Sequence, residues 1–151
     1  MLGQLSDVEI ENFLREERTG RIGCHAAGIT YVVPVTYVFD DHCVYGHSSE
    51  GRKIRMMRRN PEVCFEVDRV KAVNDWTSAI SWGRYEELRG EDGGAAMELL
   101  MSRLVAGKAG RAEHPSYPVR SADAKRPDPQ GLWVVLYRIR IAKSRGRFER
   151  P

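Results

Sequence analysis

The stretch YGHSSEGRKIRMMRRNP, from Tyr45 to Pro61, decides how the chain folds around it. It reads as the end of a strand, a tight turn of serine and glycine, and a short basic helix over 49–60 that Pro61 ends. Such a junction brings hydroxyl groups, free backbone N–H groups and cationic side chains to one place. A phosphate group requires this chemistry, so the sequence predicts that the chain holds a phosphorylated ligand here.

Four residues of this stretch could form the phosphate site: Ser48, Ser49, Arg52 and Lys53. The serine hydroxyls can donate hydrogen bonds, Arg52 can bind an oxyanion with two N–H groups, and Lys53 acts as a point charge. The alternative is that Ser49 only caps the helix and that the basic residues form a solvated face. We expect the other arginines of the helix to be surface charges: Arg55, Arg58 and Arg59.

Strands surround the junction on both sides. The segment 30–39 is the strongest predicted strand because it is rich in β-branched and aromatic residues. Pro34 within it indicates an edge, a bulge or a place where a ligand meets the backbone. After a turn at 40–41, the segment 42–47 returns as its hairpin partner. The remaining predicted strands are 21–26, 62–68, 76–88 and 132–145.

Six strands that mostly follow one another without helices between them favour an antiparallel barrel in a mainly β fold, with two to three helices at its periphery. Ser6 and Glu9 form a capping-box pattern, and Asp92 opens another helical segment. We expect one domain over 1–151, with a helix over 6–18, barrel strands within 20–88, a helix over 92–106, a loop over 107–130 and a last strand over 132–145. The predicted loop contains four prolines, and loops of this length are usually functional or mobile.

Composition and charge disfavour several classes of protein. The chain has 42% hydrophobic and 30% charged residues with a net charge of +3, as is ordinary for a globular protein. The basic helix lacks the interleaved aromatic residues that stack on bases, so nucleic-acid binding is disfavoured. Neither a signal peptide nor an apolar run of about 20 residues is evident, which predicts a cytoplasmic protein. The three cysteines are widely spaced, so we expect buried thiols rather than a disulfide framework or a metal site.

Four segments, taken in their order along the chain, resemble the pyridoxamine 5′-phosphate oxidase-like flavoproteins. They are YVVPVTYVFDD (31–41), VYGHSSEGRK (44–53), RRNPEVCFEVD (58–68) and WTSAISWGRYEEL (76–88). Within that family the sequence is most similar to the nitroimidazole-reductase (Nim-type) branch. The resemblance implies a six-stranded antiparallel FMN-binding split β-barrel, and a homodimer that binds FMN at the dimer interface.

The resemblance also implies which residues contact the cofactor. Those along the isoalloxazine ring are Val33, Pro34, Val35 and Thr36. Those beside the flavin and its ribityl phosphate are His47, Ser48 and Ser49. Those that bind the phosphate are Arg52 and Lys53, and those on a strand that approaches the ring are Trp76 and Ser78.

His47 is the candidate catalytic residue. In the Nim-type branch a histidine at this position lies close to the flavin, and the pKa of a histidine can sit near neutrality. The alternative is a hydrogen-bonded histidine at the rim of the barrel. For Trp76 and Trp82, the alternative to a catalytic role is a place in the core or in a dimer interface.

The resemblance implies an FMN-dependent oxidoreductase that reduces a small planar, nitroaromatic-like substrate, with NAD(P)H as a candidate electron donor. The redox chemistry would belong to the cofactor. Two alternatives stay open: a protein that binds or stores flavin without turnover, and a barrel that holds haem or a deazaflavin. The residues that hold pyridoxal phosphate in the oxidase itself are not matched, so oxidation of pyridoxamine phosphate is not expected.

Overall fold

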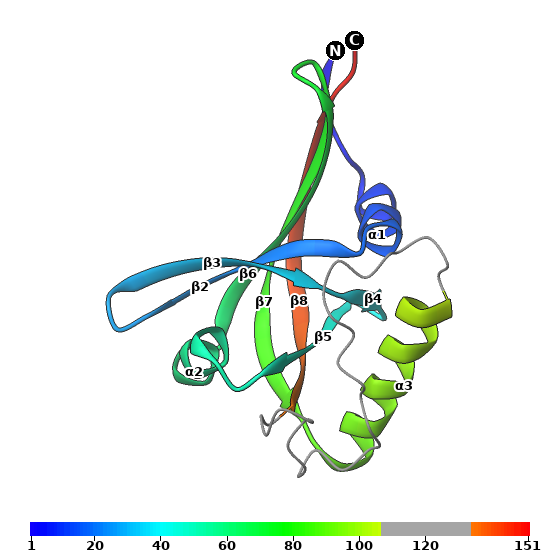
Figure 1. The fold of residues 1–151 in the computed structure, drawn as a ribbon. Helices are drawn as coiled ribbons and strands as arrows, with labels where there is room; N and C mark the ends of the chain where they lie inside the picture. The colour runs from blue at the N-terminus through cyan, green and yellow to red at the C-terminus, as the bar shows by residue number, and fades with distance from the viewer. Residues whose placement is uncertain (107–133) are drawn as a thin grey trace.

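The computed structural model describes residues 1–106 and 134–151, so the predicted loop over 107–130 lies outside the described residues. Within these two ranges the chain forms eight strands and three helices, and the strands join in one antiparallel sheet (Figure 1). The elements are β1 (Leu2–Gln4), α1 (Asp7–Glu16), β2 (Thr19–Ala26), β3 (Ile29–Thr36), β4 (Val38–Asp40), β5 (Cys43–Ser49), α2 (Arg52–Arg59), β6 (Glu62–Ala72), β7 (Asp75–Leu88), α3 (Gly90–Ala106) and β8 (Val134–Glu149). The mainly β, antiparallel fold predicted from the sequence is confirmed.

The sheet curls so that the chain itself joins its two edges. The strands lie in the order β3-β2-β6-β7-β8-β5-β4, and β1 pairs with β8 beside this path. β3 and β4 form the edges, yet Tyr37 alone separates them along the chain. In Figure 1, β3 leads directly into β4, while β6, β7 and β8 form a long twisted arm that reaches the two chain termini. The sheet is therefore an open curl, consistent with a split barrel.

Tyr37 breaks the long strand predicted over 30–39 into β3 and β4. Its backbone N–H donates to the carbonyl oxygen of Arg18 at 2.9 Å, and its buried hydroxyl donates to the carbonyl oxygen of Leu14 at 2.7 Å. These bonds attach the chain to the end of α1 and to the connection that follows it, so the strand turns here. The break and the short strand β1 make eight strands where the sequence predicts six.

The basic helix is shorter than the predicted range of 49–60. β5 continues to Ser49, which pairs with Val134 of β8. As a result, Gly51 is the N-cap and α2 begins at Arg52. The turn between strand and helix is thus formed by Glu50 and Gly51.

Other strands extend beyond their predicted ends where pairing with a neighbouring strand continues past the apolar residues. β6 extends to Ala72 and β8 to Glu149, because both pair with β7 along its length. α1 has the predicted capping box between Ser6 and Glu9 and ends at Glu16. The helix predicted over 92–106 begins slightly earlier than expected, at Gly90.

Apolar side chains fill the inside of the curl and fix the position of α2. The strands contribute Ile22, Phe65 and Tyr137, each 0% exposed. α2 packs against this core through Ile54 and Met57, as the spacing of the sequence predicts. A second cluster lies under α3 and consists of Val38, Leu88, Ala96, Leu100 and Leu136. The start of α2 is thereby held beside the end of β5.

Candidate functional site

The junction of β5 and α2 leaves the first N–H groups of the helix without a capping side chain. The N-cap is Gly51, whose backbone is extended and which has no side chain to offer. Ser49 does not cap the helix, and the Ser48 hydroxyl donates instead to the carbonyl oxygen of Ser49 at 2.9 Å. The alternative that Ser49 serves only as an N-cap is therefore wrong. The open N–H groups can donate hydrogen bonds to an external anion.

The charges of α2 make this junction an unusual helix start. Its first turn contains Arg52 and Lys53 and no acidic residue. Because the helix dipole places partial positive charge at the amino-terminal end, cations at that end are destabilising and anions are stabilising. The arrangement therefore favours a bound anion.

Lys53 is half-buried and has no ion-pair partner in the part of the chain that the structure describes. Burial lowers its pKa, and the Cys24 thiol acts weakly in the opposite direction. Arg52 is exposed, and its guanidinium carbon lies 5.8 Å from the centroid of the Tyr31 ring. Two cationic groups thus stand at the helix start, one of them partly withdrawn from water.

His47 is close enough to Lys53 for the two to interact electrostatically. Burial lowers the pKa of His47, and the charge of Lys53 acts in the same direction. The imidazole is therefore neutral near pH 7 and can both donate and accept a hydrogen bond. His47 pairs with Leu136 of β8, which belongs to the apolar cluster under α3.

The four residues predicted along the isoalloxazine ring lie on β3, an edge of the sheet. Their burial differs: Val35 is buried, Pro34 is exposed, and Val33 and Thr36 are half-buried. Among the described residues no strand pairs with the outer edge of β3, so its backbone groups there are open to a ligand. Pro34 lies on an edge strand, which is one of the three interpretations that the sequence offers for this proline, beside a bulge and a contact between ligand and backbone.

Trp76 and Ser78 lie far from the junction within one chain. Trp76 Nε1 donates to Glu149 Oε2 at 3.0 Å, and Ser78 Oγ donates to Glu66 Oε1 at 3.2 Å. Both residues are near the free end of the arm, whereas Leu88, at the other end of β7, is level with His47 across β8. The two ends of β7 are roughly 40 Å apart at the usual rise of a strand. One chain therefore brings together the junction and β3, but not Trp76 and Ser78.

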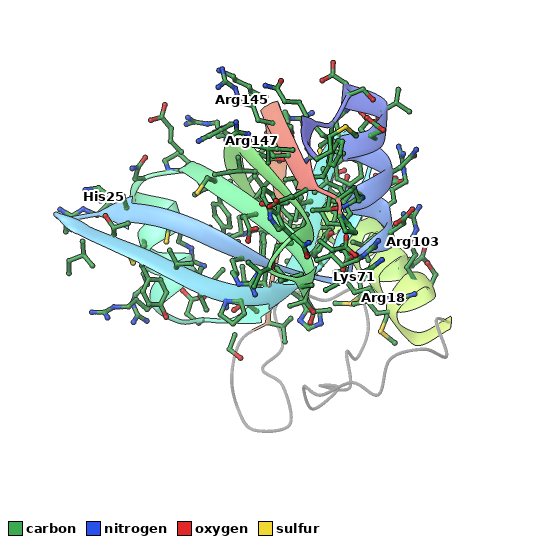
Figure 2. The ribbon with its side chains drawn as sticks, turned by 90° about the horizontal axis from the view of Figure 1, so that it is seen from above. Arg18, His25, Lys71, Arg103, Arg145 and Arg147 are labelled. Atoms are coloured by element: carbon green, nitrogen blue, oxygen red, sulfur yellow. The ribbon has the colours of Figure 1, made fainter. Side chains whose placement is uncertain are left out.

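An apolar groove of about 860 Å³ crosses the outer face of the sheet. Gly23 pairs with both Val32 and Cys64, and Cys64 pairs with Trp82, so these residues form one row across four strands. Val32 is 63% and Trp82 is 39% exposed. The groove extends to the β2–β3 hairpin, which projects from the body with His25 near its tip (Figure 2). This face presents more apolar surface than scattered single residues would.

Two features of the junction escape sequence analysis. Arg58, expected to be a surface charge, forms ion pairs with Glu50 and Glu87. Gly46 lies under the Tyr137 ring, and a Cβ atom at Gly46 would stand 2.5 Å from the Tyr137 hydroxyl oxygen. No sequence signal points to either feature, because both depend on contacts between distant segments.

Two other kinds of feature are absent from the described ranges 1–106 and 134–151. No cluster of three or more histidine, cysteine or acidic side chains that could hold a metal ion occurs there. None of the helices in these ranges has the length and apolar character needed to cross a membrane.

Comparison with known proteins gives a match over most of the chain. The sequence profile of the pyridoxamine 5′-phosphate oxidase family matches residues 6–147. An uncharacterized protein from Rhizobium meliloti (strain 1021) is 30% identical over 89 residues, which are 59% of this chain and 59% of that protein. The chain thus aligns with less than two thirds of that curated relative.

Solved structures of similar fold include flavoproteins. A FAD-binding protein from Mesorhizobium loti has a TM-score of 0.72 and 29% identity, with 99% of each chain covered. A candidate 5-nitroimidazole antibiotic resistance protein from Bacteroides thetaiotaomicron has a TM-score of 0.69 and 21% identity, with 98% of this chain and 87% of that chain covered. The flavocytochrome Anf3 from Azotobacter vinelandii has a TM-score of 0.69 and 19% identity, with 98% and 69% covered. The last two similarities show the fold alone.

Proposed function

The chain belongs to the pyridoxamine 5′-phosphate oxidase family, and on that basis we propose that it binds a flavin whose phosphate group lies at the start of α2. One observation carries the proposal: the helix start is uncapped, and its first turn holds Arg52 and Lys53 with no acidic residue. Among the described residues no carboxylate forms an ion pair with Arg52 or Lys53, so a bound anion would stabilise this helix start. The donors present, backbone N–H groups with a guanidinium and an ammonium, fit a phosphate monoester.

FMN is the proposed flavin, because it ends in the phosphate monoester that this helix start can bind. The similar protein from Mesorhizobium loti is FAD-binding, which supports the flavin class as a whole. The pyrophosphate of FAD would need the same donors and further contacts for the adenosine. Parallel titration with FMN and FAD decides between the two.

The proposed roles of the chain's residues follow from their places around the junction. The open edge of β3 from Val33 to Thr36 would receive the polar rim of the ring through backbone groups. Ser48 and Ser49 would lie beside the ribityl chain. His47, neutral near pH 7, would give one hydrogen bond to the ring or to the substrate.

The proposed activity is the reduction of a small planar substrate of the nitroaromatic type, with NAD(P)H as the electron donor. The flavin, when bound, supplies the hydride or electron transfer. The chain's own residues bind the phosphate, orient the ring and place His47 near it. The substrate class is suggested by the name of the similar protein from Bacteroides thetaiotaomicron.

The proposed assembly is a homodimer in which a second copy covers the groove on the outer face. The exposed side chains of Val32 and Trp82 support an apolar contact there. A second copy would also explain how Trp76 and Ser78 can reach a flavin, because the arm of one protomer would approach the junction of its partner. The cofactor site would then be complete only in the dimer.

Absorbance of the purified protein, followed by FMN titration into the apo form, tests the proposal. We expect oxidised-flavin bands near ~370 and ~450 nm, and weaker FMN binding in Lys53→Ala than in the wild type. Reoxidation of the reduced flavin by an added nitroaromatic compound would support turnover, and its absence would leave a flavin-binding protein. No saturable FMN binding would contradict the proposal, and haem and deazaflavin would be titrated next.

A further inference from the structure

Arg58 connects the turn before α2 to the end of β7 that lies beside β5 and β8. Its two Nη atoms hold the carboxylate of Glu50, with Nη2 at 3.0 Å from Oε2, and its Nε donates to Glu87 Oε1 at 2.9 Å. Arg58 therefore contacts a carboxylate in the turn before α2 through its Nη atoms and a carboxylate on β7 through its Nε atom. This two-sided pairing raises the pKa of Arg58, chiefly through the hydrogen bond to Glu50.

Glu87 is the fixed end of this connection. Its side chain is 17% exposed, and its carboxylate also accepts hydrogen bonds from Tyr85 Oη at 2.9 Å and from Arg89 Nη2 at 2.7 Å. Burial alone would raise the pKa of Glu87, but the hydrogen bonds from Arg89, Arg58 and Tyr85 together hold that pKa below its ordinary value. Arg58 is thus anchored to an ionised group that β7 holds in place.

Glu50 is the group whose position matters most to the anion site. It directly precedes the N-cap, Gly51, and the first turn of α2 has no acidic residue of its own. A free carboxylate there would be drawn to the uncapped N–H groups and to Lys53, and it would repel any external anion. In the structure the Glu50 carboxylate is instead turned back onto Arg58, near the end of the same helix.

We propose that Arg58 is a positioning residue that restrains Glu50 and so keeps the start of α2 open to a phosphate group. The inference rests on the proposed binding of a flavin phosphate at that site. Two roles of Arg58 can be distinguished by the loss of Glu50. If Arg58 only fastens the turn to the helix, removing the Glu50 charge weakens binding as the loss of Arg58 does. If Arg58 keeps the Glu50 carboxylate away from the site, removing the Glu50 charge leaves phosphate binding intact.

Parallel titrations with FMN and with riboflavin, which lacks the phosphate, test this role. Arg58→Ala should weaken FMN binding about tenfold, the size of a charge effect at a helix terminus, and leave riboflavin binding unchanged. Glu50→Gln should bind FMN at least as tightly as the wild type. The double variant Glu50→Gln/Arg58→Ala should regain FMN binding to within about threefold of the wild type. Arg59→Ala, an exposed neighbour on α2, is the matched control and should change neither affinity.

The outcomes separate this inference from the proposed function. If Glu50→Gln weakens FMN binding as much as Arg58→Ala does, or if the double variant shows no recovery, Arg58 is only a tether and the inference fails. If wild-type protein binds FMN no more tightly than riboflavin, the proposed phosphate site fails instead. Inorganic phosphate is followed in parallel by thermal shift, because it reports on the helix start without any flavin. Stabilisation by phosphate should be lost in Arg58→Ala and regained in the double variant, and equal stabilisation of all four proteins would overturn the inference.

Discussion

Lys53 holds a positive charge in a half-buried place where the described residues offer no carboxylate to pair with it. Burial lowers its pKa, which means that the folded apo protein disfavours the charged form that neutral pH imposes. An unpaired, half-buried charge of this kind lowers the stability of the apo protein, and it can raise the affinity for an anionic ligand. Sites that bind anions commonly carry such unfavourable charges.

Replacing Lys53 with methionine should therefore separate stability from binding. We expect Lys53→Met to stabilise the apo protein by about 1 kcal/mol, because a buried unpaired charge is removed while the apolar stem is kept. FMN affinity should fall in the same variant. Urea denaturation without flavin gives the first quantity and FMN titration gives the second. Arg55→Met, an exposed change on the same helix, is the control, and an apo stability of Lys53→Met at or below that of wild type would contradict this reading.

His47 gives a pH dependence whose sign follows from its environment. Burial lowers its folded pKa below the ordinary value of 6.5, so below that pH the unfolded chain binds a proton that the folded chain resists. Stability attributable to His47 should therefore fall as pH drops from 7 to 5. The loss should be larger in wild type than in His47→Gln, by about 1.4 kcal/mol for each unit of depression. Denaturation curves of both proteins at pH 7, 6 and 5 measure this difference, and parallel pH profiles would contradict a depressed pKa.

At the scale of single residues, sequence analysis identified the basic pair but did not predict which contacts two of its neighbours make. Arg52 and Lys53 stand at the helix start as the motif predicts. Ser49 was a candidate cap, but β5 continues through it and moves the cap to Gly51. Arg58 is exposed, as expected, but its ion pair with Glu87 was not predicted, because Glu87 lies on a strand that the local sequence does not place nearby. Local patterns predict which groups are available, and pairing between segments decides which of them meet.

The tight β2–β3 hairpin shows where the sequence of an element conflicts with its backbone. The tip of the β2–β3 hairpin has φ of 52° at Ala27 and 76° at Gly28, the pattern of a type I′ turn. Glycine adopts such angles freely, but alanine does not, because its Cβ approaches the backbone. The tip projects from the body of the molecule (Figure 1), and Ala27 is exposed, so none of the described residues requires alanine there.

Ala27→Asn should stabilise the protein, because asparagine followed by glycine is the preferred sequence of this turn. We expect a gain of about 0.5–1 kcal/mol in the free energy of unfolding. Gly28→Ala, which places a second Cβ at a positive φ, should have the opposite effect. Thermal or urea unfolding of the three proteins measures both changes. Equal stability of the two variants would show that the turn does not have this geometry.

At the scale of elements, the strands were predictable wherever one face is buried. Val63, Phe65 and Val67 alternate in the sequence and all three are buried in β6. The division of the segment 30–39 at Tyr37 was not predictable, because it depends on hydrogen bonds to Arg18 and Leu14. The apolar and β-branched character of that segment continues on both sides of the break.

The whole molecule leaves one face of its sheet without a cover in the part that the structure describes. α1 and α2 pack on the inner core and α3 covers the end of the sheet near β4, β5 and β8. The groove that contains Trp82 and Cys64 lies on the remaining outer face. Family membership and the antiparallel, mainly β fold could be predicted from the motifs. The order of the strands and this uncovered face could not, because they depend on pairing between distant segments and on how strongly the sheet curls.

A charged residue in the groove should disrupt the proposed dimer. We expect wild-type protein to be a dimer in solution, and Trp82→Glu to raise the dimer dissociation constant at least tenfold, because a desolvated carboxylate would enter an apolar contact. Light scattering after size-exclusion chromatography measures the mass of each. Val8→Glu, an exposed change on α1, is the control and should remain dimeric. A monomeric wild type would contradict the proposed dimer. A Trp82→Glu variant as dimeric as the control would show that the dimer contact lies outside this groove.

The most direct test of the central claim is a crystal structure of the protein soaked with FMN. The account predicts electron density for the phosphate group within hydrogen-bond distance of the first backbone N–H groups of α2 and of the Arg52 and Lys53 side chains, with the ring along the edge of β3. A phosphate group that points into solvent, or a flavin bound away from the β5–α2 junction, would contradict it.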